Sequence, residues 1–369
     1  MGFLYGLDSL SPSQDYGYFK AQNVLSSSLP FVWEWKSVKQ KPVLCLTSQM
    51  ERWSGILKIP LCPNNKSFYR VGASLCLSSS SPKTLTVPSA NAIFFHGDRV
   101  AGTGNPVIEK LSDLQKVAEI LVSKFGASVN AWVIEASVFN GPFALYKEFI
   151  PSMTSTGEPE SYSPIGYPAS TVTVSLLSNS LQEAKNIIST AVGEPCSANT
   201  CETYFYDYQP RTLILGFSKG GVVLNQLISE LAFLEGKSIG SGAAIQEEIQ
   251  IVPTTKEGLL DSIKEIHYID VGLNSAGAYI SDPNVIERIS KRLMESSRGL
   301  HFILHGTPRQ WCDGRRAWIC DEKDKLVHLL EQESHKNGGI LQVCERFYFA
   351  DRPPNMQMHF EIIESLNVN

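Results

Sequence analysis

The sequence predicts an α/β fold in which a mostly parallel sheet carries helices on both faces. From about residue 91, short apolar runs recur along the chain, and most of them are followed by a helical pattern. Each run ends in a polar or glycine-containing turn, which would place these turns together at one edge of a parallel sheet. One of them, after residue 215, sets a serine between an apolar run and an apolar helical segment.

The region before this repeating pattern has a different character. Residues 1–50 are irregular and contain prolines and paired aromatic residues, so we expect an N-terminal arm packed on the main domain. Residues 51–369 would form that single domain. Residues 54–60 and 67–77 alternate and are rich in β-branched side chains, which predicts antiparallel strands at the sheet edge.

The repeating part predicts strands and two clear helices. Asn105 can cap a first helix, Pro106 suits its first turn, and its apolar face continues to Gly126. Asp282 can cap a second helix that runs from about Pro283 to Arg298. The predicted strands are Ala92–Phe95, Ala131–Glu135, Thr212–Leu215, Ile266–Ile269, Leu300–Leu304 and Arg346–Phe349.

Two stretches are longer than the connections of such a fold require. Residues 137–210 contain a predicted helix at roughly Ser180–Ala191, and residues 236–254 are rich in glycine and serine. Insertions at these points would lie over the carboxyl ends of the strands, where open α/β sheets bind ligands. We expect lid-like insertions, with plain surface loops as the alternative.

Composition narrows the possible partners and compartment. The 369 residues carry a net charge of −5, which argues against a nucleic-acid partner, and no apolar run is long enough for a transmembrane segment. The eight cysteines show no zinc spacing, so we expect no metal site. No secretory or mitochondrial leader is evident. We therefore expect a soluble, intracellular protein that acts on a small-molecule or acylated substrate without a cofactor.

The segment Gly216-Phe217-Ser218-Lys219-Gly220-Gly221 has the pattern of a nucleophile elbow. In such a turn the serine takes a strained backbone conformation that exposes its hydroxyl, and glycines permit close approach of the neighbouring strand and helix. The amide of the next residue can then stabilise an oxyanion. Ser218 is therefore the candidate nucleophile, and the backbone of Lys219 a candidate donor. The Lys219 amine itself could simply face solvent.

The order serine, acid, histidine along the chain resembles the α/β-hydrolase superfamily. The resemblance implies a three-layer α/β sandwich, with His359 as the base and Asp313, after the next-to-last strand, as the acid. Asp270, at the preceding strand end, is the alternative acid, and Asp321 and Asp324 lie nearby. A second oxyanion donor would come from the turn His96-Gly97-Asp98. His305, at another strand end, could contact substrate or make a structural hydrogen bond.

Five short segments carry a narrower resemblance that covers most of residues 50–365. They are Trp53–Leu57, Asn140–Phe143, Gly216–Gly221, His305–Pro308 and the pair His359-Phe360. In these segments the chain resembles the uncharacterised family of homologues of the human chromosome 2 open reading frame 69 protein, whose animal members are described as mitochondrial. That resemblance implies a hydrolase without an agreed substrate, and a mitochondrial location as the alternative to the cytoplasm.

Together these features predict a serine hydrolase that cleaves an ester or thioester through an acyl-enzyme on Ser218, with a lipid or acylated molecule as the expected substrate. The rival hypothesis is a catalytically silent member of the same fold that uses its pocket for binding or scaffolding.

Overall fold

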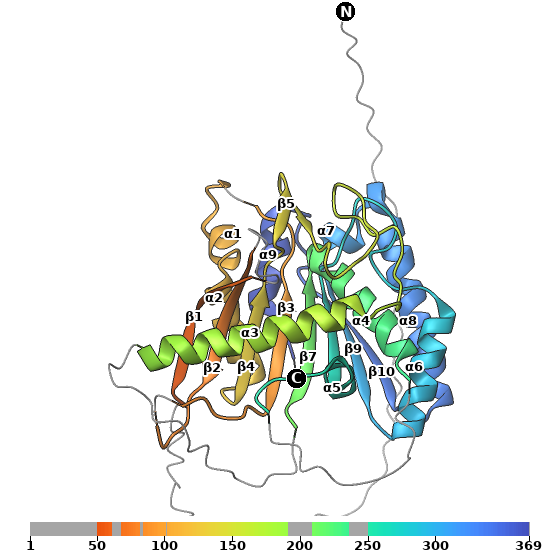
Figure 1. The fold of residues 1–369 in the computed structure, drawn as a ribbon. Helices are drawn as coiled ribbons and strands as arrows, with labels where there is room; N and C mark the ends of the chain where they lie inside the picture. The colour runs from red at the N-terminus through yellow and green to blue at the C-terminus, as the bar shows by residue number, and fades with distance from the viewer. Residues whose placement is uncertain are drawn as a thin grey trace, which may run out of the picture. The chain divides into compact units, whose positions relative to one another are not determined.

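The computed structural model describes residues 50–60, 68–81, 84–100, 102–190, 209–235 and 250–368 (Figure 1). All of them belong to one compact unit, Ser48–Asn369. The expected arm at residues 1–50 lies outside the described residues except for residue 50. Most of the second predicted insertion, residues 236–249, also lies outside them.

The described residues form an eight-stranded sheet in the order β1-β2-β4-β3-β7-β8-β9-β10. The first two pairings, β1 with β2 and β2 with β4, are antiparallel, and all the other pairings are parallel. The predicted sheet with antiparallel N-terminal strands is confirmed. The strands are β1 Arg52–Pro60, β2 Phe68–Cys76, β3 Ala90–Phe95, β4 Val129–Ile134, β7 Arg211–Phe217, β8 Ile263–Ile269, β9 Leu300–Gly306 and β10 Leu341–Phe347.

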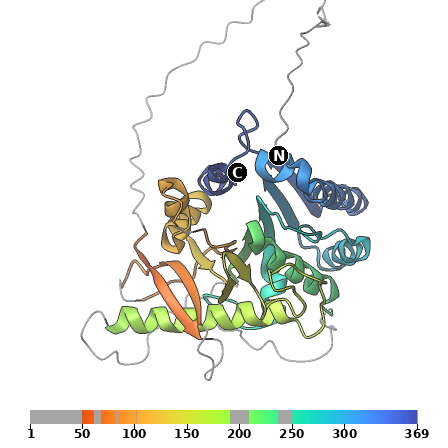
Figure 2. The ribbon, with the colours of Figure 1, turned by 90° about the horizontal axis from the view of Figure 1, so that it is seen from above.

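Helices cover both faces of this sheet, as Figure 2 shows from above. One face carries α1 (Pro106–Leu111), α2 (Leu114–Phe125) and α9 (Met356–Ser365), which share a core cluster with the central strands. The helices that share the other cluster are α3 Pro168–Thr190, α4 Gly221–Phe233, α5 Lys256–Ser262, α6 Pro283–Ser296 and α8 Trp318–Lys336. Two helical layers around one sheet give the predicted three-layer arrangement.

The central strands are apolar throughout because both of their faces are buried. In β3, Ile93 and Phe95 face one core cluster, whereas Ala92 and Phe94 face the other. Successive side chains of a strand point to opposite faces, so a strand between two helical layers needs apolar residues at every position. This is why the predicted strands are continuous apolar runs rather than alternating ones.

Three predicted elements differ from the structure by a break or by five or more residues at one end. The helix expected from Asn105 to Gly126 is two helices, because the Asp113 side chain accepts a hydrogen bond from the Lys116 amide at 2.9 Å and caps a new one. Strand β10 begins at Leu341, five residues before its predicted start at Arg346, because its partly exposed side chains hide the apolar pattern.

Helix α3 is longer than the predicted Ser180–Ala191. Its first turn is stabilised from another helix, since the buried Glu230 carboxylate of α4 accepts hydrogen bonds from the amides of Ala169 and Ser170, both at 2.8 Å. A carboxylate at a helix N-terminus satisfies amides that have no intrahelical partner. The helix then crosses one face of the sheet (Figure 1). Before α3, the inserted stretch forms the hairpin β5 (Val138–Asn140) and β6 (Phe143–Leu145).

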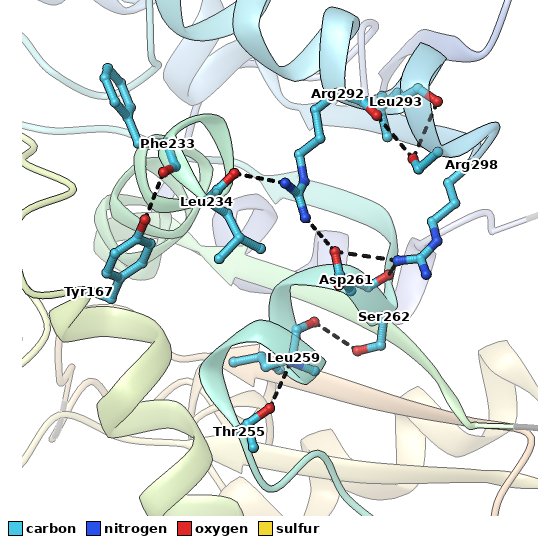
Figure 3. Close-up of polar contacts among 12 residues, drawn as sticks. Tyr167, Phe233, Leu234, Thr255, Leu259, Asp261, Ser262, Arg292, Leu293 and Arg298 are labelled. Carbon is cyan, nitrogen blue, oxygen red and sulfur yellow. Dashed lines mark hydrogen bonds and ion pairs between the residues drawn. The ribbon is translucent and has the colours of Figure 1, made fainter. Parts of the chain in front are cut away.

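Polar contacts join helix ends at the edge where β8 begins, as Figure 3 shows. Asp261, near the end of α5, lies 2.6 Å from Nη2 of Arg292 and 3.3 Å from Nη1 of Arg298. Arg292 also donates to the carbonyl of Leu234 at the end of α4, at 2.7 Å. These contacts stabilise the opposite edge from the one that carries the candidate site. Within the described ranges, every helix is too short or too polar to cross a membrane.

Candidate active site

The turn after β7 has the geometry of an elbow. Ser218 has a φ of 52°, in the left-handed region that non-glycine residues rarely adopt, and is 8% exposed. A Cβ on Gly216 would lie 2.7 Å from a Leu224 methyl, and a Cβ on Gly220 would lie 2.0 Å from the Phe95 carbonyl oxygen. The glycines therefore permit β7, α4 and the neighbouring β3 to meet tightly at Ser218.

The carboxylate at the end of β8 is held by contacts on both oxygens. Asp270 is 0% exposed and also has a positive φ, 44°. Its Oδ1 accepts a hydrogen bond from the Thr307 amide at 2.8 Å, and its Oδ2 accepts one from the Thr307 hydroxyl at 3.0 Å. Nδ1 of His359 lies 2.7 Å from the same Oδ2. A buried carboxylate with these partners keeps a single orientation.

His359 lies next to the elbow. It belongs to α9, which Asn355 caps by accepting from the Met358 amide at 2.8 Å. The ring of His359 packs against that of Phe217, the residue before Ser218, with 4.6 Å between centroids. Because Nδ1 faces Asp270, Nε2 is the nitrogen left for other chemistry. Among the residues that the structure describes, no hydrogen bond joins the Ser218 hydroxyl to His359.

The structure does not bring Asp313, the expected acid, to His359. Asp313 begins the short helical turn Gly314–Arg316 and accepts hydrogen bonds from the Arg315 amide at 3.0 Å and Arg316 Nε at 2.9 Å. The Arg316 hydrogen bond holds the pKa of Asp313 below its usual value. His359 contacts Asp270 instead. Thr307, just before α7 (Pro308–Trp311), donates hydrogen bonds to this carboxylate at the end of β8 and orients it.

The turn after β3 lies directly against the serine. A Cβ on Gly97 would be 2.6 Å from Cβ and 3.1 Å from Oγ of Ser218, so only a glycine permits this approach. The neighbouring Asp98 points its carboxylate elsewhere: Oδ1 accepts from the Ala144 amide at 2.7 Å. Burial raises the pKa of Asp98. His96 is buried against Phe217, and burial lowers its pKa.

The amine of Lys219 is buried, contrary to the expectation from the sequence that it could face solvent. The side chain is 1% exposed, and its Nζ donates to the Thr156 carbonyl at 2.7 Å and lies 3.2 Å from Glu158 Oε1. Nζ is also 3.7 Å from Asp98 Oδ1 and 4.6 Å from the centroid of the Phe143 ring. The partners lie far away in the sequence, so no local pattern indicates them.

His305 makes structural hydrogen bonds rather than facing the elbow. Its Nε2 lies 3.1 Å from Nδ1 of His267, and its Nδ1 lies 2.9 Å from the Tyr348 hydroxyl. Nε2 of His267 lies 3.0 Å from Glu265 Oε2. Burial lowers the pKa of His267 and lowers that of His305 well below its usual value. Two neutral rings allow one consistent direction of donation, from Tyr348 through both histidines to Glu265.

Within the described residues, no three or more His, Cys, Asp or Glu side chains are grouped so that they could hold a metal ion.

The strand order, the elbow at Ser218 and the buried Asp270–His359 pair at the same sheet edge define an α/β-hydrolase-like protein. Residues 169–336 match the family model C2orf69. The chain is 27% identical over 259 residues to the mitochondrial protein C2orf69 homolog of Danio rerio, covering 68% of this chain and 64% of that protein. It is 27% identical over 285 residues to the mitochondrial protein C2orf69 of Homo sapiens, covering 68% and 66%. These matches show that the chain is similar to members of the C2orf69 family.

The match spans a little under two thirds of the relatives' own length. Among solved structures, a ferulic acid esterase is similar with a TM-score of 0.41 and 11% identity, covering 86% of this chain and 97% of that chain. The BES protein from Bacillus cereus is similar with a TM-score of 0.40 and 12% identity, covering 89% and 97%.

Proposed function

We propose that this protein is a serine hydrolase that cleaves an ester or thioester through an acyl-enzyme on Ser218. The observation that carries the proposal is the 2.7 Å contact between His359 Nδ1 and the buried carboxylate of Asp270, beside a serine at positive φ. Asp270, and not Asp313, is the acid in this proposal. The Lys219 amide and an amide of the turn Gly97–Asp98 are the proposed oxyanion donors.

In the proposed reaction, the proton on His359 Nδ1 stays in the hydrogen bond to Asp270, so Nε2 carries a lone pair. Nε2 takes the proton of the Ser218 hydroxyl while Oγ attacks the carbonyl carbon of the substrate. The resulting oxyanion is stabilised by the two backbone amides. His359 then returns the proton to the leaving oxygen or sulfur. A water molecule repeats the sequence on the acyl-enzyme and releases the acid.

The shape of the site supports a slender substrate. Ser218 is 8% exposed and His359 is 5% exposed, so a reacting carbonyl must enter between side chains rather than lie on an open surface. A flexible acyl chain or another small ester meets this requirement. We propose such an acylated or lipid-like small molecule as the substrate, and a mitochondrial location in line with the names of the relatives.

A binding or scaffold protein without catalysis is the second candidate. It is supported by one observation: within the described residues, the Ser218 hydroxyl and His359 are not hydrogen-bonded. In a working triad that contact closes when substrate binds, since catalytic hydrogen bonds are often long in free enzymes. The two candidate functions therefore differ in whether Ser218 reacts covalently with an electrophile.

Labelling with a fluorophosphonate probe decides between the two candidates. The full-length protein is incubated with the probe beside Ser218→Ala and the matched control Ser262→Ala, whose hydroxyl bonds to Leu259 at the far edge of the sheet. We expect labelling of the wild type and of Ser262→Ala, and none of Ser218→Ala. A folded wild-type protein that takes up no label would support the scaffold instead.

A further inference from the structure

The buried ammonium of Lys219 connects the elbow with two parts of the chain that surround it. It contacts Thr156 and Glu158 in the inserted stretch and Asp98 in the turn after β3. The residue itself follows Ser218 in the elbow. Asp98 and Arg99 also contact the inserted stretch, at the Ala144 amide and the Phe139 ring, and Lys219 adds a contact that comes from the elbow itself.

The inserted segment, defined here as residues 138–160, is compact where Lys219 meets it. Gly157 has a φ of 77°, and a Cβ there would lie 2.3 Å from the Ala144 carbonyl oxygen, so this turn packs tightly on β6. Asn140 donates to the Ser155 carbonyl at 2.9 Å and joins the hairpin to the same turn. The segment is therefore tightly packed at the place where Lys219 contacts it.

Lys219 also contacts the turn after β3, which lies against Ser218. The carboxylate oxygen of Asp98 that is 3.7 Å from Nζ also accepts from the Ala144 amide of β6 at 2.7 Å. Lys219 supplies one proposed oxyanion amide from its own backbone, and the turn Gly97–Asp98 supplies the other. One side chain thus connects both backbones that would hold the oxyanion.

Burial of a charged lysine side chain costs folding free energy, so packing alone does not account for a lysine at this position. Burial of an ammonium requires compensation from its partners, and an apolar side chain of similar volume is often as stable or more so. Glu158 is 4% exposed, and its Oε1 has no hydrogen bond besides the ion pair with Lys219. The Lys219–Glu158 ion pair therefore adds little net stability, and its main effect is to hold both side chains in fixed positions.

We infer that Lys219 is a positioning residue whose ammonium fixes the inserted segment against both walls of the oxyanion hole. This inference deepens the proposed function and rests on it. When the ammonium is removed, the turn Gly97–Asp98 keeps its strand pairing through β3 but loses its ionic contact with the elbow, and its amide is held less firmly where the oxyanion forms. Misplacement of a reacting group by about 1 Å costs about 10²-fold in rate.

The test separates positioning from stability with a double variant. Lys219→Met leaves Glu158 buried without a partner, so we expect a lower melting temperature. Lys219→Met/Glu158→Gln removes both charges and should regain most of that loss. The rate constant for fluorophosphonate labelling should stay about 10²-fold below wild type in both variants. Labelling of the double variant within threefold of the wild type overturns the inference.

A matched control is available in α8. Lys323 is also buried, contacts Asp324 and Glu345 and lies 4.9 Å from the centroid of the Trp311 ring. Lys323→Met should lower the melting temperature but leave the labelling rate of Ser218 unchanged.

Hydrogen exchange gives a second measurement that does not require activity. In the double variant the Ala144 amide and its neighbours in residues 138–160 should exchange at least tenfold faster than in Lys323→Met. Unchanged exchange there overturns the inference. If the wild type takes up no label, the proposed function fails, and the exchange measurement alone decides whether Lys219 anchors the segment.

Discussion

Replacement of Asp270 by asparagine is the sharpest test of the site. The side chain keeps its size, and Oδ1 can still accept from the Thr307 amide. The amide nitrogen would then occupy the place of Oδ2, 2.7 Å from His359 Nδ1, where it can only donate. His359 would have to accept at Nδ1 and carry its proton on Nε2. In that tautomer it cannot take the proton of Ser218.

The expected loss follows from two contributions. The carboxylate stabilises the imidazolium that forms during the reaction, and two unit charges about 4 Å apart at an effective dielectric constant of about 20 interact with about 4 kcal/mol. That corresponds to about 10³-fold in rate. The wrong tautomer adds to this loss, and the same substitution in a serine protease triad lowers kcat by about 10⁴. We expect a decrease of about 10³- to 10⁴-fold.

The assay is the second-order rate constant of fluorophosphonate labelling, together with hydrolysis of a p-nitrophenyl ester at pH 7.5. Asp313→Asn is the matched control, because it removes a carboxylate that contacts only Arg315 and Arg316 at the surface. Its cost should be about 0.2–1 kcal/mol of stability, with the rate unchanged. A folded Asp270→Asn variant that keeps a tenth of the rate, or a large loss in Asp313→Asn, would refute the reasoning.

Two further predictions follow from the structure. Gly97→Ala would place a Cβ 2.6 Å from Ser218 Cβ, so the labelling rate should fall about 10²-fold, and the melting temperature should also fall because the neighbouring backbone must shift; an unchanged rate would contradict the close approach. The lowered pKa values of His267 and His305 predict that stability is complete above the unfolded pKa of about 6.5 and decreases as pH falls below it, because the unfolded chain then binds more protons. This pair should contribute up to about 2.7 kcal/mol per pH unit to the slope of urea-unfolding stability between pH 5 and 7, in addition to His96 and His301, whose pKa values burial also lowers. His267→Gln should reduce the slope, and equal slopes in both proteins would contradict the buried neutral pair.

The fold could be predicted from the sequence because its strands and helices depend on local patterns. A strand buried on both faces, such as Ala90–Phe95, must be apolar throughout, and this pattern is visible without any knowledge of its partners. The elbow could be found for the same reason, since its glycines and serine are neighbours. The break between α1 and α2 also had a local signal, the capping residue Asp113.

The contacts of the site depended on distant residues and could not be predicted in the same way. Asp270 and Asp313 are both acids after strands, and only the position of Thr307 brings the first of them to His359. Lys219 is surrounded by Glu158 and Asp98, which lie 61 and 121 positions away in the chain. A sequence pattern shows that such a lysine is present but not which carboxylates approach it.

The positive φ angles of Ser218 and Asp270, 52° and 44°, bear on how this protein should be engineered. At each position an L-amino acid incurs a cost of about 1–2 kcal/mol that glycine would not. A design procedure that rewards backbone relaxation alone would therefore favour glycine at both positions and remove the proposed nucleophile and its proposed acid together. Anyone who stabilises this chain should fix those two residues in advance and seek improvements at the opposite edge of the sheet, around Asp261 and Arg292.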